Sequence, residues 1–259
     1  SQAKSFVGKQ LLEKVDAFVT IGGEATSATV EVVGEKSGLT PIVFIAVVDP
    51  VGRGLVKSRE SSGNNLTGVT NMGIELCEKR MAVFKEVAPH IQKIMVFIHI
   101  HQEDEAITSC VKMVERSAQR LNLKPVEVFV WDKEDLEGAL KEINREMADG
   151  IFVLSDCALF VENLDLLIQA AKRKGLPIMT FMEESVTKQG GLVCYGPSYY
   201  ELGSQSARLV DKVLKGEEPK NIPIERPLSI KFVLNLKFAE ILGLKLTDQV
   251  LAKTDKIVE

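Results

Sequence analysis

The stretch "KSFVGKQLLEKVDAFVTIGGEAT" (Lys4–Thr26) consists of a helical pattern, an aspartate, a short β-branched run and a loop of small residues. The stretch "EDLEGALKEINREMADGIFVLSDCAL" (Glu134–Leu159) has the same order of segments. Asp16 of the first copy corresponds to Asp149 of the second. Two copies of one α/β layout predict two similar lobes.

Short β-branched runs alternate with amphipathic helical patterns along almost the whole chain. The predicted strands are Ala17–Ile21, Pro41–Val47, Lys93–Ile98, Val126–Trp131, Gly150–Ser155 and Pro177–Phe181. The clearest predicted helices are Glu24–Ser37, Ile74–Val87, Asp104–Leu121, Lys133–Met147 and Val161–Lys174. Because short, continuous apolar runs between helices are typical of buried parallel strands, the alternation predicts an α/β fold with parallel sheets.

The two copies of the repeat are unequal in what precedes them. A complete strand–helix–strand, Lys93–Trp131, comes before the second copy, whereas nothing comes before the first. A parallel sheet without its first strand–helix–strand unit exposes an apolar edge and one bare face. We therefore expect an incomplete first lobe, with about 40–60 residues absent upstream or another element over that edge. An intrinsically smaller first lobe is the alternative.

The stretch "GGLVCYGPSYYELGSQSARLVDKVLKG" (Gly190–Gly216) predicts a strand, a break at Gly196-Pro197 and a helix. We expect the chain to return here to the first lobe, with the Gly-Pro pair at a hinge. An ordinary turn fits the same composition. The predicted domains are residues 1–90 plus 197–259 for the first lobe and residues 91–196 for the second.

The composition excludes several classes of protein. Of the 259 residues 45% are hydrophobic and 26% are charged, as in a well-packed globular protein. The net charge of −4, without a basic block, argues against nucleic acid as a partner. The apolar runs are far shorter than the roughly 18 residues of a membrane helix. The four cysteines match no metal-binding spacing, so we expect free, mostly buried thiols, with no metal and no cofactor.

Four motifs carry a resemblance to a known family. They are "DPVGRGLV", "NNLTGVTNM", the Gly190–Gly216 stretch with its continuation "EEPKNIPIERP", and "FVLNLKFAEILGLKL". These motifs resemble the ABC-transporter substrate-binding family that includes tryptophan- and tyrosine-type binding proteins. The resemblance implies two flavodoxin-like lobes of the periplasmic binding protein type I kind, hinge-linked, with the ligand in a cleft. It also implies one more N-terminal βαβ unit, a periplasmic or extracytoplasmic location, and often a lipid anchor. We expect the βαβ unit and the anchor in a full-length form rather than in this chain.

In parallel α/β sheets, ligands bind beyond the carboxyl ends of the strands, next to helix N-termini. In the first lobe the loop after the first strand contains Gly22, Gly23 and Thr26, whose amides and hydroxyl suit a carboxylate. A plain tight turn is the alternative for this loop. Asp49 follows the next strand and suits an ammonium group, with an Asx-turn or helix cap as the alternative.

In the second lobe four candidate residues follow predicted strands: His99, Asp156, Phe181 and Glu183. Asp156 suits an amine or another polar contact, with a helix N-cap as the alternative. Phe181 and Glu183 suit an amphipathic small molecule, with core packing as the alternative for Phe181. A metal at His99 and His101 is not expected, because no further ligands are spaced for zinc.

With the resemblance, these residues predict an extracytoplasmic protein that delivers a small molecule to an ABC permease by cleft closure. An amino acid is the expected ligand, with an aromatic side chain favoured. The sequence has no GxSxG, Walker or HExxH motif, so an enzyme is not expected. The alternative is the ligand-sensing domain of a transcriptional regulator or receptor, because the site and the attached parts decide function on a given fold.

Overall fold

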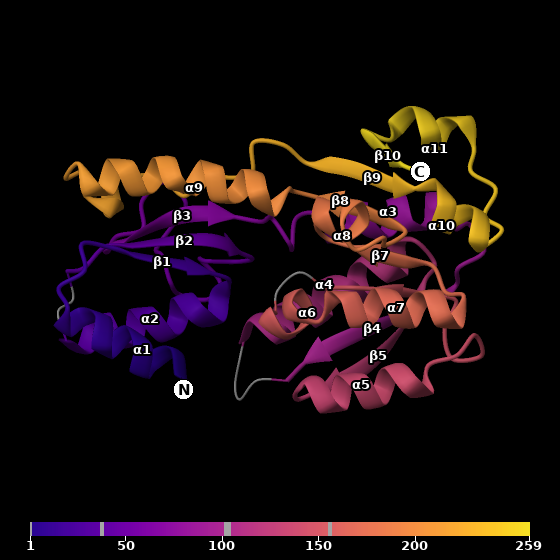
Figure 1. The fold of residues 1–259 in the computed structure, drawn as a ribbon, viewed down its shortest axis with the longest axis horizontal. Helices are drawn as coiled ribbons and strands as arrows, with labels where there is room; N and C mark the ends of the chain where they lie inside the picture. The colour runs from indigo at the N-terminus through magenta and orange to yellow at the C-terminus, as the bar shows by residue number, and fades with distance from the viewer. Residues whose placement is uncertain (1, 37–38, 101–104, 155–156) are drawn as a thin grey trace. The chain divides into compact units, whose positions relative to one another are not determined.

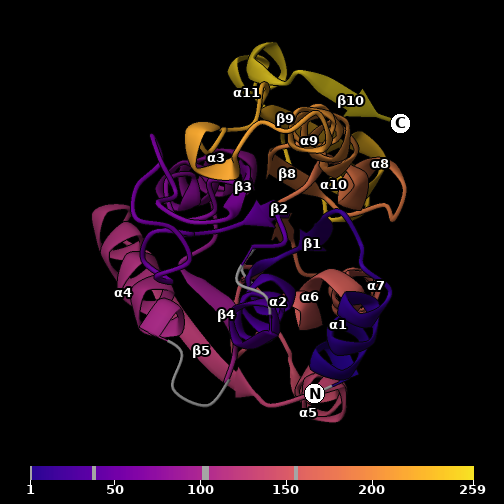
Figure 2. The same ribbon diagram turned by 90° about the vertical axis from the view of Figure 1, so that its left-hand side faces the viewer.

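The computed structural model describes residues 2–36, 39–100, 105–154 and 157–259 (Figures 1 and 2). The chain forms two compact units. Unit 1 consists of Ser1–Met72 and Tyr199–Leu228, and unit 2 of Gly73–Ser198 and Ser229–Glu259. Each unit contains one mainly parallel sheet with helices packed on it, which confirms the predicted α/β fold.

Unit 1 contains a three-stranded parallel sheet in the order β1-β2-β3. Its strands are β1 (Phe18–Ile21), β2 (Ile42–Val47) and β3 (Leu66–Thr70), and its helices are α1 (Gln2–Leu12), α2 (Gly23–Lys36) and α9 (Tyr199–Leu214). Figure 1 shows α1 and α2 on one face of this sheet and α9 on the other. Every residue of the central strand β2 is buried, because both of its faces are covered.

The core of unit 1 has two layers. On the α1/α2 face, Phe44 of β2 packs in one cluster with Val33 of α2. On the α9 face, Ile45 packs in another cluster with Leu209. The edge strand β1 is less well covered, since Val19 and Ile21 are 53% and 62% exposed.

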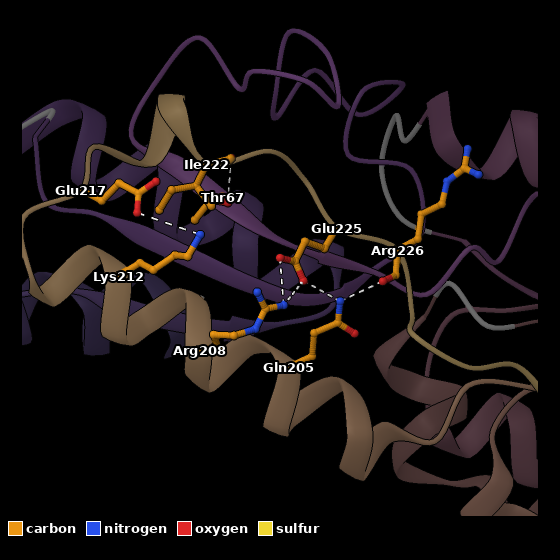
Figure 3. A network of polar contacts seen from close by, with 8 residues as sticks. All are labelled: Thr67, Gln205, Arg208, Lys212, Glu217, Ile222, Glu225 and Arg226. Atoms are coloured by element: carbon orange, nitrogen blue, oxygen red, sulfur yellow. Dashed lines mark hydrogen bonds and ion pairs between the residues drawn. The ribbon is translucent and has the colours of Figure 1, made fainter.

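After α9 the chain passes through the short helix η1 (Pro219–Asn221) and returns along β3 (Figure 3). The Thr67 hydroxyl of β3 donates to the backbone carbonyl of Ile222 at 3.1 Å. The backbone N–H of Glu225 donates to the carbonyl of Gly68 at 2.9 Å. The returning segment is therefore hydrogen-bonded to the side of β3 that faces away from β2.

Two side chains of α9 hold this segment through Glu225 (Figure 3). Gln205 Nε2 donates to the Glu225 carboxylate at 2.6 Å and to the carbonyl of Arg226 at 2.8 Å. Arg208 Nη2 donates to both carboxylate oxygens, at 2.7 and 3.0 Å. Gln205 is only 5% exposed, so its side of the contact between the helix and the segment is nearly buried.

Unit 2 contains a seven-stranded sheet in the order β10-β9-β8-β7-β6-β4-β5, parallel except between β8 and β9. The strands are β4 (Lys93–His99), β5 (Lys124–Val130), β6 (Gly150–Phe152), β7 (Ile178–Thr180), β8 (Val193–Gly196), β9 (Lys231–Asn235) and β10 (Lys256–Val258). Five of them follow the flavodoxin-like 2-1-3-4-5 order as β5-β4-β6-β7-β8. The strand order therefore reverses between β4 and β6, which is where open α/β sheets bind ligands.

The helices of unit 2 connect these strands. They are α3 (Cys77–Val87), α4 (Glu105–Arg120), α5 (Lys133–Glu142), α6 (Ala158–Glu162), α7 (Leu164–Lys174), α8 (Glu183–Thr187), α10 (Leu236–Ile241) and α11 (Asp248–Lys253). Local signals set several helix ends. Asp132 caps α5 by accepting from the N–H of Asp135 at 3.0 Å, and α7 ends at Gly175 in the left-handed conformation.

Two predicted helices differ from the observed ones. The helix predicted over Lys133–Met147 ends at Glu142. The Asn144 side chain accepts from the N–H groups of Glu146 and Met147, at 2.9 and 3.2 Å, and so stabilises a turn in place of a further helical turn. The helix predicted over Val161–Lys174 is two helices, α6 and α7, because the backbone leaves the helical conformation at Asn163.

The two units also differ from the predicted domain boundaries, in residues 73–90, 197–198 and 229–259. These three segments are predicted in the first lobe but belong to unit 2. Helix α3 packs on β7 and β8, with Met81 and Phe84 fully buried. Strand β9 pairs with β8 in the antiparallel direction, so the chain re-enters the second sheet after Leu228. One boundary between the units falls between Ser198 and Tyr199, one residue after the Gly-Pro pair.

Candidate functional site

The loop after β1 is a tight turn into α2. Gly22 has a φ of +79°, which favours glycine, and its carbonyl accepts from the Thr26 hydroxyl at 2.7 Å. The Thr26 hydroxyl also lies 2.8 Å from that of Thr20, and Thr26 is fully buried. The Thr26 hydroxyl is therefore occupied inside unit 1, and the loop offers a ligand the backbone amides at the start of α2.

A cationic side chain lies against the same loop. A Cβ built on Gly23 would stand 2.7 Å from Nε and 2.8 Å from Cζ of Arg53. The Arg53 guanidinium therefore packs directly on Gly23, the first residue of α2. The sequence pattern indicates Gly23 but not Arg53, because the two residues meet only when the loops after β1 and β2 lie side by side.

Asp49 follows β2 and organises the loop that contains Arg53. The Asp49 carboxylate accepts from the N–H of Gly52 at 2.9 Å, and its backbone carbonyl accepts from the N–H of Arg53 at 3.0 Å. This bond to the N–H three residues on has the spacing of the cap considered as an alternative role of Asp49. Gly52 suits it, because a Cβ there would overlap the carboxylate. The turn positions Asp49 and Arg53 at the carboxyl edge of the sheet in unit 1.

In unit 2, His99 at the end of β4 contacts Cys157 in the loop after β6. Cys157 Sγ lies 2.9 Å from His99 Nδ1, and His99 Nε2 lies 2.9 Å from the backbone carbonyl of Trp131. The Phe160 ring meets the imidazole edge-on at 6.5 Å between centroids. These groups gather at the point where the strand order of the sheet reverses. Asp156, the third candidate at this point, lies outside the described residues.

The two candidates after β7 already have contacts within unit 2. Phe181 is 2% exposed, in agreement with the core-packing alternative. Glu183 begins α8, and its carboxylate accepts from Lys256 Nζ at 2.7 Å. The hydrogen bond and the charge of Glu183 raise the pKa of Lys256 above its ordinary value. Glu183 is therefore paired with a cation of β10, so a ligand amine would have to compete with Lys256.

A small cavity in unit 2 lies at the opposite end of the sheet. Its volume is about 130 Å³, and its lining includes Asp149 and Pro177, which precede β6 and β7. Ligand cavities usually measure about 300–1,000 Å³, and parallel sheets bind ligands at their carboxyl ends. The cavity is thus separate from the candidate site.

The family model for "ABC transporter substrate binding protein" matches residues 3–258, which is almost the whole chain. The chain belongs to the ABC transporter substrate-binding protein family. Members of this family are extracytoplasmic solute-binding proteins rather than enzymes. The family assignment confirms the resemblance of the four sequence motifs.

Among curated proteins, this substrate-binding protein is similar to a tyrosine-binding protein of Clostridioides difficile, with 26% identity over 233 residues. That match covers 90% of this chain and 64% of the relative. An uncharacterised protein of Rickettsia prowazekii is 22% identical over 223 residues, covering 86% of this chain and 65% of the relative. The chain thus spans slightly less than two thirds of the length of both relatives.

Solved structures agree with the fold. A conserved domain protein of Vibrio cholerae superposes with a TM-score of 0.87 at 28% identity, over 98% of this chain and 82% of that one. An ABC domain of Streptococcus pneumoniae in complex with L-Trp gives a TM-score of 0.85 at 19% identity, over 99% and 85% of the two chains. These matches confirm the two-lobed fold of the periplasmic binding protein type I kind. Within the described ranges, every helix is too short or too polar to span a membrane.

Proposed function

We propose that this protein binds an amino acid at the carboxyl edges of its sheets and delivers it to the permease of an ABC importer. The observation that carries the proposal is the packing of Arg53 on Gly23 at the start of α2. A guanidinium binds a carboxylate through parallel N–H donors, and the first amides of a helix attract the same negative charge. The α-carboxylate of an amino acid suits both groups.

Asp49 supports the recognition of the α-ammonium group. It lies in the same turn as Arg53, and that turn holds its carboxylate through the N–H of Gly52. A carboxylate has about four lone-pair sites, so one backbone bond leaves capacity for an ammonium donor. Asp156 is proposed for a related polar contact.

An aromatic side chain of the ligand is supported by residues of unit 2 and by two relatives. The imidazole of His99 lies at the point of strand reversal, where the buried ring of Phe160 packs edge-on against it, and an aromatic ligand side chain favours such a ring as a neighbour. One relative is named a tyrosine-binding protein, and one solved relative holds L-Trp. We therefore infer that tyrosine and tryptophan are the first ligands to test.

Delivery to a permease requires a conformational signal. A ligand that contacts the edges of both sheets binds a closed arrangement better than an open one, and so shifts the population toward the closed form. A permease in the membrane then distinguishes loaded from empty protein. An extracytoplasmic location, with a lipid anchor in a longer form, belongs to the same proposal.

A thermal-shift screen against the twenty amino acids tests the binding step. A ligand at 100 times its dissociation constant stabilises the folded state by about 2.7 kcal/mol, which raises the melting temperature by several degrees. We expect shifts with tyrosine or tryptophan, and their loss in Arg53→Gln but not in Lys57→Gln, an exposed neighbour. No shift with any amino acid, for this chain and for a form as long as the relatives, would overturn the proposal.

A further inference from the structure

His99 and Cys157 form a thiol–imidazole pair whose tautomer is set by the backbone. The Trp131 carbonyl, 2.9 Å from His99 Nε2, can only accept a hydrogen bond, so Nε2 carries a proton. In the neutral ring Nδ1 is then the basic nitrogen, and Cys157 Sγ lies 2.9 Å from it. The Cys157 thiol therefore shares its proton with His99 Nδ1, and the Trp131 carbonyl already orients the His99 ring.

We infer that Cys157 is a base-activated nucleophile, a modification site for small soft electrophiles and for peroxides. Proton transfer from Sγ to Nδ1 produces a thiolate beside an imidazolium. The imidazolium is stabilised through Nε2–H by the Trp131 carbonyl. The thiolate, not the thiol, is the reactive form of cysteine, and a neighbouring imidazolium increases its population.

The other cysteines with described side chains provide internal controls. Cys77 and Cys194 are 0% exposed, whereas Cys157 is 7% exposed. Burial raises the pKa of Cys194 far above its ordinary value, and the charges of Glu183 and Glu184 raise it further, against a backbone hydrogen bond from Val233. Such a thiol remains protonated and unreactive at neutral pH.

The reaction of Cys157 with hydrogen peroxide needs no group other than the thiolate and the His99 imidazolium. The thiolate sulfur attacks one peroxide oxygen, the O–O bond breaks, and hydroxide leaves. Sulfur is oxidised to sulfenic acid while the peroxide is reduced. The imidazolium gives its Nδ1 proton to the hydroxide, which leaves as water, and the neutral imidazole is restored.

Modification would also add atoms at the point of strand reversal in unit 2. This second consequence rests on the proposed function, because it assumes that the ligand binds there. An oxidised or alkylated Cys157 then occupies space at the ligand site and lowers affinity. The reactivity of the thiol does not depend on that assumption.

Limited labelling of the native protein with iodoacetamide, followed by peptide mass spectrometry, tests the reactivity. We expect Cys157 to react at least about tenfold faster than Cys77 and Cys194. His99→Gln removes the base and should slow labelling of Cys157 by about tenfold, with an unchanged circular dichroism spectrum. Equal rates at Cys157 and Cys194 would overturn the inference. Unchanged labelling of Cys157 in His99→Gln would also overturn it, since 7% exposure alone would then explain the labelling.

A second measurement does not require a folded His99 variant. The difference in ultraviolet absorbance between the wild type and Cys157→Ser at neutral pH should contain the band of a thiolate, and a difference without that band contradicts the proton transfer.

Binding is assayed separately with tyrosine and tryptophan before and after peroxide treatment. Loss of binding in the wild type but not in Cys157→Ser supports the effect on the ligand site. Absence of binding before treatment argues against the proposed function and leaves the labelling result intact.

Discussion

Gly196, the last residue of β8, lies directly against the backbone carbonyl of Phe181 at the end of β7. A Cβ on Gly196 would overlap the carbonyl oxygen and stand 2.8 Å from the carbonyl carbon. The obstacle is backbone, which cannot rotate away as a side chain can. The glycine of the Gly-Pro pair is therefore required by the packing of two neighbouring strands.

Gly196→Ala should destabilise unit 2, because β7 and β8 must separate to accommodate one methyl group. We expect a loss of about 1–3 kcal/mol in the free energy of unfolding, as in other overpacked sites. Urea denaturation followed by circular dichroism measures it. Gly203→Ala is the matched control: it lies in α9 with no atom within 4 Å of the new Cβ, and should stabilise the protein by about 0.5–1 kcal/mol. Equal stability of the two variants would contradict the packing argument.

Gly23→Ala should separate ligand binding from stability. The new Cβ meets the guanidinium of Arg53, the mobile end of a flexible side chain, so Arg53 moves and the fold loses little. If Arg53 holds the ligand carboxylate, its displacement should lower affinity for amino acids by about tenfold or more, since a charge-assisted hydrogen bond contributes about 1.5–3 kcal/mol. Titration calorimetry measures the affinity.

The control for Gly23→Ala is Gly34→Ala in the same helix, where the Cβ meets no atom within 4 Å. This exposed change should leave affinity unchanged. A Gly23→Ala variant that binds amino acids as well as Gly34→Ala would remove Arg53 from the site.

Glu225 should contribute more to the stability of unit 1 than its ion-pair partner. Glu225→Ala leaves the nearly buried amide of Gln205 without its carboxylate acceptor, so we expect a loss of about 1–3 kcal/mol. Arg208→Ala removes a side chain that is 52% exposed, and should cost at most about 1 kcal/mol. Glu225→Gln keeps an acceptor for Gln205 and should lie between them. Urea denaturation that ranks Arg208→Ala as the most harmful would contradict this order.

A strand can be predicted from the sequence when the pattern that specifies it lies within the strand itself. Strand β2 is a continuous β-branched run, and its prediction needs no knowledge of its neighbours. Strand β3, "LTGVT", is not predicted, because Gly68 interrupts its short apolar run. The structure explains that glycine: a Cβ on Gly68 would overlap the carbonyl of Phe44 in β2. Gly68 is thus required by the close approach of β2, and the same glycine weakens the apolar pattern of β3.

The candidate site is partly predictable for the same reason. The rule that ligands bind at the carboxyl ends of parallel strands selects Gly23 and His99 directly. Their partners, Arg53 and Cys157, are distant in sequence and become neighbours only through strand order. Cys157 meets His99 because β6 pairs with β4, an arrangement that local periodicity does not specify.

Glu127 on the edge strand β5 should make stability depend on pH in the mildly acidic range. Burial, and then the charge of Glu115, raise the pKa of Glu127 above its ordinary value. Because the folded-state pKa is the higher one, the favourable contribution is present below the unfolded pKa, about 4.3, and is lost as pH rises through the folded value. Glu127→Gln should therefore be more stable than the wild type at pH 7, and the two should converge below about pH 4.

Glu115→Gln removes only the charge repulsion and should recover a smaller part of the stability that the wild type loses at pH 7. Urea denaturation at both pH values decides: a Glu127→Gln advantage that is equal at pH 7 and pH 4 would mean that packing, not ionisation, separates the variants.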